Sequence, residues 1–128
     1  MEKVLAFNLD ESQMKGLYKI CGQMKILLID VPASQMLKSL KEMTEFKPYR
    51  GERLSENIPS NVISDSTKKE TMIVMCSVTD KHVDKILASI RMTGLGIDYK
   101  ALLTPVNKDW NGVRMLAQMA AEKRAHEK

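Results

Sequence analysis

The sequence has few of the residues and motifs that small proteins most often use for chemistry. Among 128 residues there are only two cysteines and two histidines, and no CxxC or HxxxH spacing indicates a metal site. No GxGxxG or GxxxxGK[ST] motif is present for binding phosphates. No apolar run approaches the roughly 20 residues that a membrane span requires. We therefore expect no metal, no cofactor and no membrane partner.

The start of the chain also lacks the features of a signal peptide. Its first residues, MEKV, provide neither a basic region nor a long apolar segment. Cys21 and Cys76 occupy positions in apolar patterns, which predicts buried, reduced thiols. Both observations predict a cytoplasmic protein.

The charge is low and mixed in sign. The formal net charge is +4, and lysines and arginines alternate with aspartates and glutamates without a run of one sign. Three Tyr, two Phe and one Trp leave few rings for stacking on bases. This pattern is typical of a solvated surface, so nucleic-acid binding is only our third hypothesis.

The clearest structural pattern lies in the second half of the chain. Residues 72–78 form an apolar run of strand length, which predicts a strand covered on both faces. Helical spacing follows, with one stripe formed by Val83, Ile86, Leu87 and Ile90. Gly94 can end this helix in the left-handed conformation. Residues 99–103 then predict a second strand, which Pro105 closes.

The first half repeats this order of elements. Strands are predicted at residues 4–9 and 25–31, and the helix between them is predicted to end at Gly22. Each half continues into an amphipathic helix, over residues 34–43 in the first half and from Asn107 to about residue 124 in the second.

We therefore predict a single domain over residues 1–128. Its parts are a first β-α-β-α half at residues 1–43, an irregular connector at 44–70 and a second β-α-β-α half at 71–128. The connector could present a binding tip at residues 48–51, although a mobile connector is the favoured interpretation.

Two architectures fit four strands joined in this way. The favoured one is an α+β fold, in which two strand-helix-strand units form a ferredoxin-like sandwich with strands 1 and 3 central and two extra helices. The alternative is a small doubly wound α/β sheet with all strands parallel. The ferredoxin-like sheet would have an apolar second face, covered by the extra helices or by another copy of the chain.

Polar residues gather where the last predicted strand turns into the last predicted helix. Asn107 can cap that helix, and Trp110 can begin its inward stripe, which explains the segment without a ligand. The functional interpretation is that Thr104 and Asn107 anchor an anion or nucleotide at the helix N-terminus, with Lys100 and Trp110 nearby. These four residues are our candidate ligand-binding site, and we identify no catalytic residue.

The same segment resembles a known family. The resemblance rests on a strand that ends in a Leu-Thr-Pro turn and leads to an Asn and a Trp, carried here by Lys100, Ala101, Leu103, Thr104, Pro105, Asn107 and Trp110. On these residues, the stretch from about 70 to 120 resembles an uncharacterised bacterial family known only as domain of unknown function 3783. Val106 departs from the polar residue expected there. The resemblance implies a fold unit and no catalytic role.

The sequence leaves enzymatic activity open and favours its absence. The leading hypothesis is a non-enzymatic module that associates with itself, as a dimer, or with another protein. The alternative hypothesis is a sensor of a small anionic metabolite or nucleotide that binds at the turn from Thr104 to Trp110.

Overall fold

The computed structural model describes residues 1–52 and 70–126. Most of the predicted connector, residues 53–69, therefore lies outside the described residues. The elements in chain order are β1 (Lys3–Phe7), α1 (Glu11–Gln23), β2 (Leu27–Val31), the 3-10 helix η1 (Ala33–Gln35), α2 (Leu40–Met43), β3 (Met72–Cys76), α3 (Asp80–Thr93), β4 (Tyr99–Leu102) and α4 (Gly112–His126).

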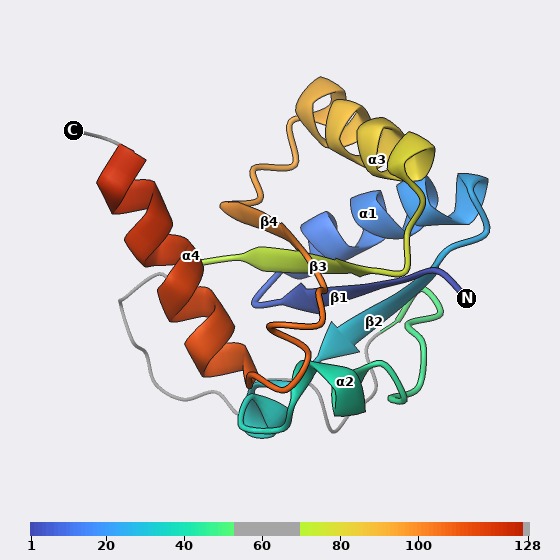
Figure 1. Cartoon of the computed structure of the whole chain (residues 1–128). Coiled ribbons are helices and arrows are strands. Elements are labelled where there is room, and N and C mark those ends of the chain that lie inside the picture. The colour runs from blue at the N-terminus through green and yellow to red at the C-terminus, as the bar shows by residue number, and fades with distance from the viewer. Residues whose placement is uncertain (53–69, 127–128) are drawn as a thin grey trace.

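The four strands form one open sheet in the order β2-β1-β3-β4 (Figure 1). β1 and β2 are parallel, β3 and β4 are parallel, and the central pair β1 and β3 is antiparallel. The predicted α+β class, the four strands and the central position of β1 and β3 are confirmed.

Both finer architectures are wrong. A ferredoxin-like sheet would place β4 beside β1 and β2 beside β3, whereas here each strand-helix-strand unit keeps its two strands adjacent. The all-parallel alternative fails because β1 and β3 run in opposite directions. The sheet thus consists of two intact parallel units joined edge to edge.

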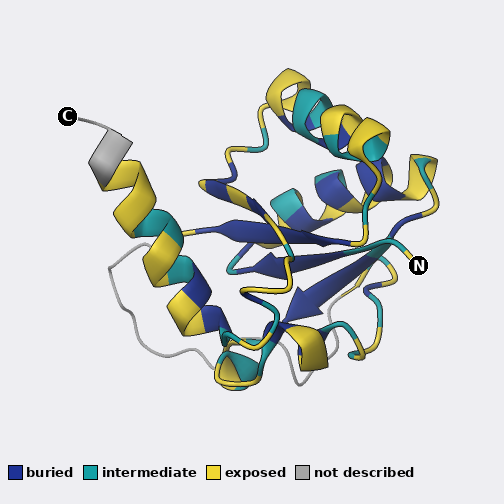
Figure 2. Ribbon diagram, viewed as in Figure 1, coloured by how far each residue is buried: buried dark blue, intermediate teal, exposed yellow. Residues whose placement is uncertain are grey.

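Helices cover both faces of this sheet (Figures 1 and 2). Alternate residues of β1 point to opposite sides, so Val4 and Ala6 pack under α1 and α3, while Leu5 and Phe7 pack under α2 and α4. All four side chains are fully buried. The strands are apolar on both faces because helices of the same chain cover both faces, so no second copy of the chain is needed to explain this pattern.

The helix α1 ends later than predicted. Asp10 and Gln13 form a capping box at its start, with the Gln13 N–H donating to Asp10 Oδ1 at 2.7 Å. Gly22 lies inside the helix and does not end it. The left-handed residue after α1 is Lys25, with φ 59°. By contrast, Gly94 ends α3 as predicted, with φ 67°.

The segment after β2 is less helical than predicted. In place of one helix over residues 34–43, the chain forms η1 and the short α2, separated by residues 36–39. Ser39 begins α2 with a second capping box, in which Glu42 is the reciprocal partner. This interruption matters because the residues between η1 and α2 pair with the segment before α4.

Each outer edge of the sheet carries a hydrogen bond from outside the sheet. On β2, the Leu28 carbonyl accepts from the Tyr49 N–H at 2.7 Å. On β4, the Leu102 carbonyl accepts from Asn107 Nδ2 at 3.1 Å. β4 also has only four residues and exposes Lys100, and both features discourage pairing with another strand.

Two glycine substitutions should have opposite effects on stability. In Gly94→Ala the new Cβ is strained at φ 67°, so we expect a loss of about 1 kcal/mol in the free energy of unfolding. In Gly22→Ala the position is helical with open space around a new Cβ, so we expect a gain of up to about 1 kcal/mol. Urea denaturation measures both, and a destabilised Gly22→Ala would contradict the helix boundary.

Candidate functional site

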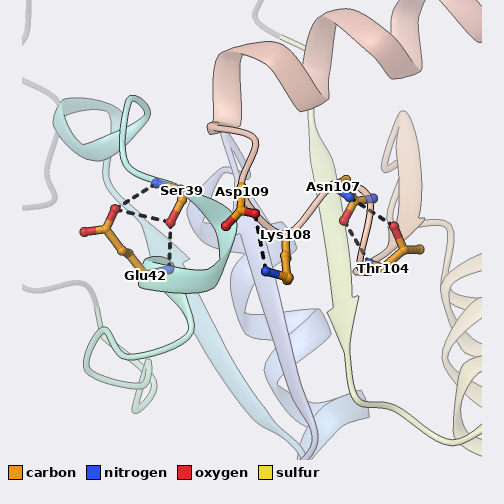
Figure 3. Close-up of polar contacts among 6 residues, drawn as sticks. All are labelled: Ser39, Glu42, Thr104, Asn107, Lys108 and Asp109. Carbon is orange, nitrogen blue, oxygen red and sulfur yellow. Dashed lines mark hydrogen bonds and ion pairs between the residues drawn. The ribbon is translucent and has the colours of Figure 1, made fainter.

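The turn after β4 is held together by its own polar groups (Figure 3). The Thr104 N–H donates to Asn107 Oδ1 at 2.8 Å, and the Asn107 N–H donates to Thr104 Oγ1 at 3.2 Å. Asn107 Nδ2 donates to the Leu102 carbonyl, so both polar atoms of the amide are engaged. Asn107 is only 7% exposed. Its position is that of a structural side chain inside the turn.

The last helix begins later than predicted. α4 starts at Gly112, and its first turn is capped by Asn111, whose Oδ1 accepts from the Arg114 N–H at 2.8 Å. The prediction that Asn107 caps this helix is therefore wrong. Trp110 likewise precedes the helix and does not stand in its first turn. The sequence contains two asparagines at this point, and cap propensity alone does not distinguish them.

The segment before α4 pairs with the segment around Ser39. An isolated antiparallel bridge joins Ser39 and Asn111, and the Leu40 N–H donates to the Trp110 carbonyl at 2.8 Å. The Gly112 N–H donates to the Met36 carbonyl at 2.8 Å. The N–H groups of Gly112 and Arg114, which would be the donors of a helix N-terminal anion site, thus already have partners.

The structure brings together only two of the four candidate ligand-binding residues. Thr104 and Asn107 bond each other, but Lys100 and Trp110 lie on different sides of the sheet. Lys100 pairs in register with Ile73, whose side chain belongs to the α1 and α3 face. Trp110 is half-buried against the core on the α2 and α4 face.

Trp110 has a cationic neighbour within its own segment. The Arg114 guanidinium carbon lies 4.3 Å from the centre of the indole ring, which is a cation–π geometry. Beside the turn, Lys108 Nζ lies 3.3 Å from Asp109 Oδ2 in an exposed ion pair. The basic groups nearest to Trp110 therefore contact groups of the protein itself.

His82 has a structural partner. Its Nδ1 lies 2.7 Å from Glu2 Oε2, and the same carboxylate accepts from the Thr79 N–H at 3.0 Å. Thr79 is the N-cap of α3, so Glu2 joins the start of β1 to the start of that helix. The His82 side chain is thus part of a contact between the start of β1 and the start of α3.

The two cysteines are buried free thiols on opposite faces of the sheet. Cys21 packs with α1 and α3, and Cys76 packs with α2 and α4. Burial raises the pKa of each thiol to about 12, so neither forms a thiolate readily at neutral pH.

The described residues contain no cluster of three or more His, Cys, Asp or Glu side chains that could bind a metal ion. They also contain no helix with the length and apolar character needed to cross a membrane.

Sequence reasoning missed a set of residues at the edge of β2. Tyr18 and Lys19 from α1, Lys25 from the following turn, and Arg50 from the start of the connector line one groove. They come from three segments that share no motif and are adjacent only after folding. The one available signal was the predicted binding tip at residues 48–51.

Replacing Glu2 by Gln should flatten the acid part of the stability profile. The Thr79 N–H and then His82 lower the pKa of the Glu2 carboxyl below its ordinary value of 4.5. A lowered folded-state pKa adds stability above pH 4.5, and this stability is lost as the pH falls through the folded-state value. We expect the free energy of unfolding of Glu2→Gln, measured in urea between pH 6 and 3, to fall less steeply than that of the wild type. If the free energy of unfolding fell equally steeply with pH in both proteins, the contact of Glu2 with Thr79 and His82 would be contradicted.

Replacing Asn107 by Ala should destabilise the protein more than removing the true cap. Asn107→Ala leaves the Thr104 N–H and the Leu102 carbonyl without their partners, for an expected cost of about 2 kcal/mol. Asn111→Ala removes one cap, for about 1 kcal/mol. Denaturant unfolding of both variants checks the order, and a larger loss for Asn111→Ala would contradict the structural role of Asn107.

Comparison with protein families gives a match in the second half of the chain. Searches of curated proteins and of solved structures give no match. A family model does match residues 71–125, which include β3, α3, β4 and most of α4. The resemblance found in the sequence is thereby confirmed for these residues, which match the family described as Domain of unknown function (DUF3783).

Proposed function

We propose that the protein is a non-enzymatic module that acts by self-association. The observation that carries this proposal is a group of exposed aliphatic side chains where the two paired segments meet. Leu37 is 77% exposed, Val106 is 74% exposed and Val113 is 52% exposed. We call these three residues the apolar patch.

Hydrogen bonds bring these residues to one region of the surface. Leu37 follows Met36, whose carbonyl accepts from the Gly112 N–H, and Val113 follows Gly112. Val106 stands in the turn that the α2 segment contacts through the Lys41 N–H and the Lys108 carbonyl, 3.0 Å apart. These hydrogen bonds already fix the conformation of the backbone that carries the apolar patch. Binding therefore loses little conformational entropy there, which favours association.

The surroundings of the apolar patch suit a second copy of the chain. A twofold interface presents the same surface from both subunits, so it must be complementary to itself. The segment that carries Val106 and Val113 also holds Lys108, Asp109 and Arg114, and this mixture of signs permits ion pairs across a twofold axis. A patch of one sign would instead favour a partner of opposite charge.

This surface differs from the one that the sequence led us to expect. The sequence left open whether the extra helices or another copy of the chain cover the second sheet face, and α2 and α4 cover it. The proposed dimer therefore forms through the outer side of this helical layer. It needs no rearrangement of the core.

Binding of a small anionic metabolite or nucleotide at the turn from Thr104 to Trp110 is the second hypothesis. The exposed side of Thr104 favours it. Two observations make it weaker than self-association: the polar atoms of the Asn107 amide are bonded inside the turn, and Lys100 lies on the opposite side of the sheet from Trp110. Nucleic-acid binding stays the third hypothesis, because acidic and basic residues are intermixed along the chain.

Sedimentation velocity tests the proposal directly. We expect the wild type to shift from monomer to dimer between micromolar and submillimolar concentrations. Leu37→Ser with Val113→Ser should weaken the dimer by about tenfold or more, because apolar burial at the interface is lost.

The matched control is Met92→Ser. Met92 is 86% exposed on α3, on the other side of the sheet, and its replacement should leave the dimer unchanged. A wild type that stays monomeric at the highest concentration would overturn the proposal. Equal weakening by Met92→Ser would show that the apolar patch is not the interface.

A further inference from the structure

An open groove of about 500 Å³ lies beside the edge strand β2. One wall is the C-terminal part of α1, and the other is the segment around Tyr49. The Tyr49 N–H fixes that segment to β2 by donating to the Leu28 carbonyl at 2.7 Å. The volume falls within the range of sites for single small molecules, and it is too small for a folded partner.

Two tyrosines form the aromatic part of the groove. The rings of Tyr18 and Tyr49 pack nearly perpendicular, at 86°, with their centres 5.3 Å apart. Tyr49 is buried, whereas Tyr18 is 39% exposed. The buried ring holds the outer ring in place, so Tyr18 offers a preorganised surface to a flat ligand.

Three cations surround this aromatic surface. Lys19, Lys25 and Arg50 line the groove together with apolar and tyrosine side chains, and no carboxylate is among the lining residues that the structure describes. None of the three forms an ion pair with a carboxylate of the described residues. Elsewhere on the chain acidic and basic residues are intermixed, so this local excess of positive charge indicates an anionic ligand.

We propose that this groove binds a mononucleotide. The guanidinium of Arg50 and the two ammonium groups suit a phosphate, which takes several charge-assisted hydrogen bonds. The tyrosine pair and the apolar floor suit the base, because bases stack on aromatic rings with little dependence on sequence. A phosphate alone would leave the aromatic surface unused, and an uncharged nucleoside would leave the cations unused.

A structural explanation of the lysines makes a different prediction. Lys19 and Lys25 lie near the C-terminal end of α1, where positive charge offsets the negative end of the helix dipole. Such a role affects stability and gives no ligand affinity. Direct binding measurements therefore separate the two explanations.

The test is isothermal titration calorimetry of the full chain at low salt, with AMP, adenosine and inorganic phosphate as probes. We expect saturable binding of AMP, with adenosine and phosphate each weaker by about tenfold or more. Amide shifts in NMR spectra should gather around Gly22 and Tyr49, which lie in the groove. Absence of AMP binding, or equal affinity for phosphate, would overturn the proposal.

Paired variants locate the site. Lys19→Ala with Arg50→Ala should lower AMP affinity by about tenfold or more, whereas Lys85→Ala with Arg91→Ala removes the same charge from exposed positions on α3 and should not. Equal losses in the two pairs would show that AMP responds only to overall charge. If AMP affinity fell only in Lys100→Ala, the nucleotide would bind near β4, and the assignment of the site to the groove would be wrong. The groove and the apolar patch share no residue. The outcome of the AMP experiment therefore does not decide whether the protein self-associates, which sedimentation velocity tests separately.

Discussion

The antiparallel pairing of β1 with β3 is the contact on which the rest of the structure depends. Each strand-helix-strand unit forms its own parallel pair, but only this central ladder joins the two units into one sheet. Its register places Leu5 opposite Val74 and Ala6 opposite Ile73, and all four side chains are fully buried. The two cores therefore share the same pair of strands, one on each face.

This sharing makes the two layers of helices interdependent. A change of one residue in the register of β1 against β3 would exchange the residues facing α1 and α3 with those facing α2 and α4. Phe7, which packs under α4, is much larger than its neighbour Ala6, so the two faces cannot exchange them without voids and clashes. The unequal sizes of successive residues thus fix the register.

Local patterns in the sequence predicted the elements well and their assembly poorly. The strands and the role of Gly94 in ending α3 depend on neighbouring residues, and both are found in the structure. The order of the strands depends on which edges pair, and apolar runs such as residues 72–76 carry no information about direction. Gly22 was misassigned because a glycine near a helix end is a common stop signal, while here Lys25 takes the left-handed conformation.

The candidate site was predictable only where its contacts are local. Thr104 and Asn107, which the sequence singled out together, are three residues apart and bond each other within one turn. The partner segment of the turn, around Ser39, is distant in sequence, and so are the tyrosines of the groove. No periodicity reports contacts at such separations, because they depend on how the two units meet.

The two hydrogen bonds at the sheet edges limit how the protein can assemble. Tyr49 occupies an outward carbonyl of β2, and Asn107 occupies one of β4, so neither edge offers an uninterrupted ladder to a strand of another molecule. Molecules that cannot add strands to one another do not build fibres by extending their sheets. The two bonds therefore oppose polymerisation by sheet extension at both described edges.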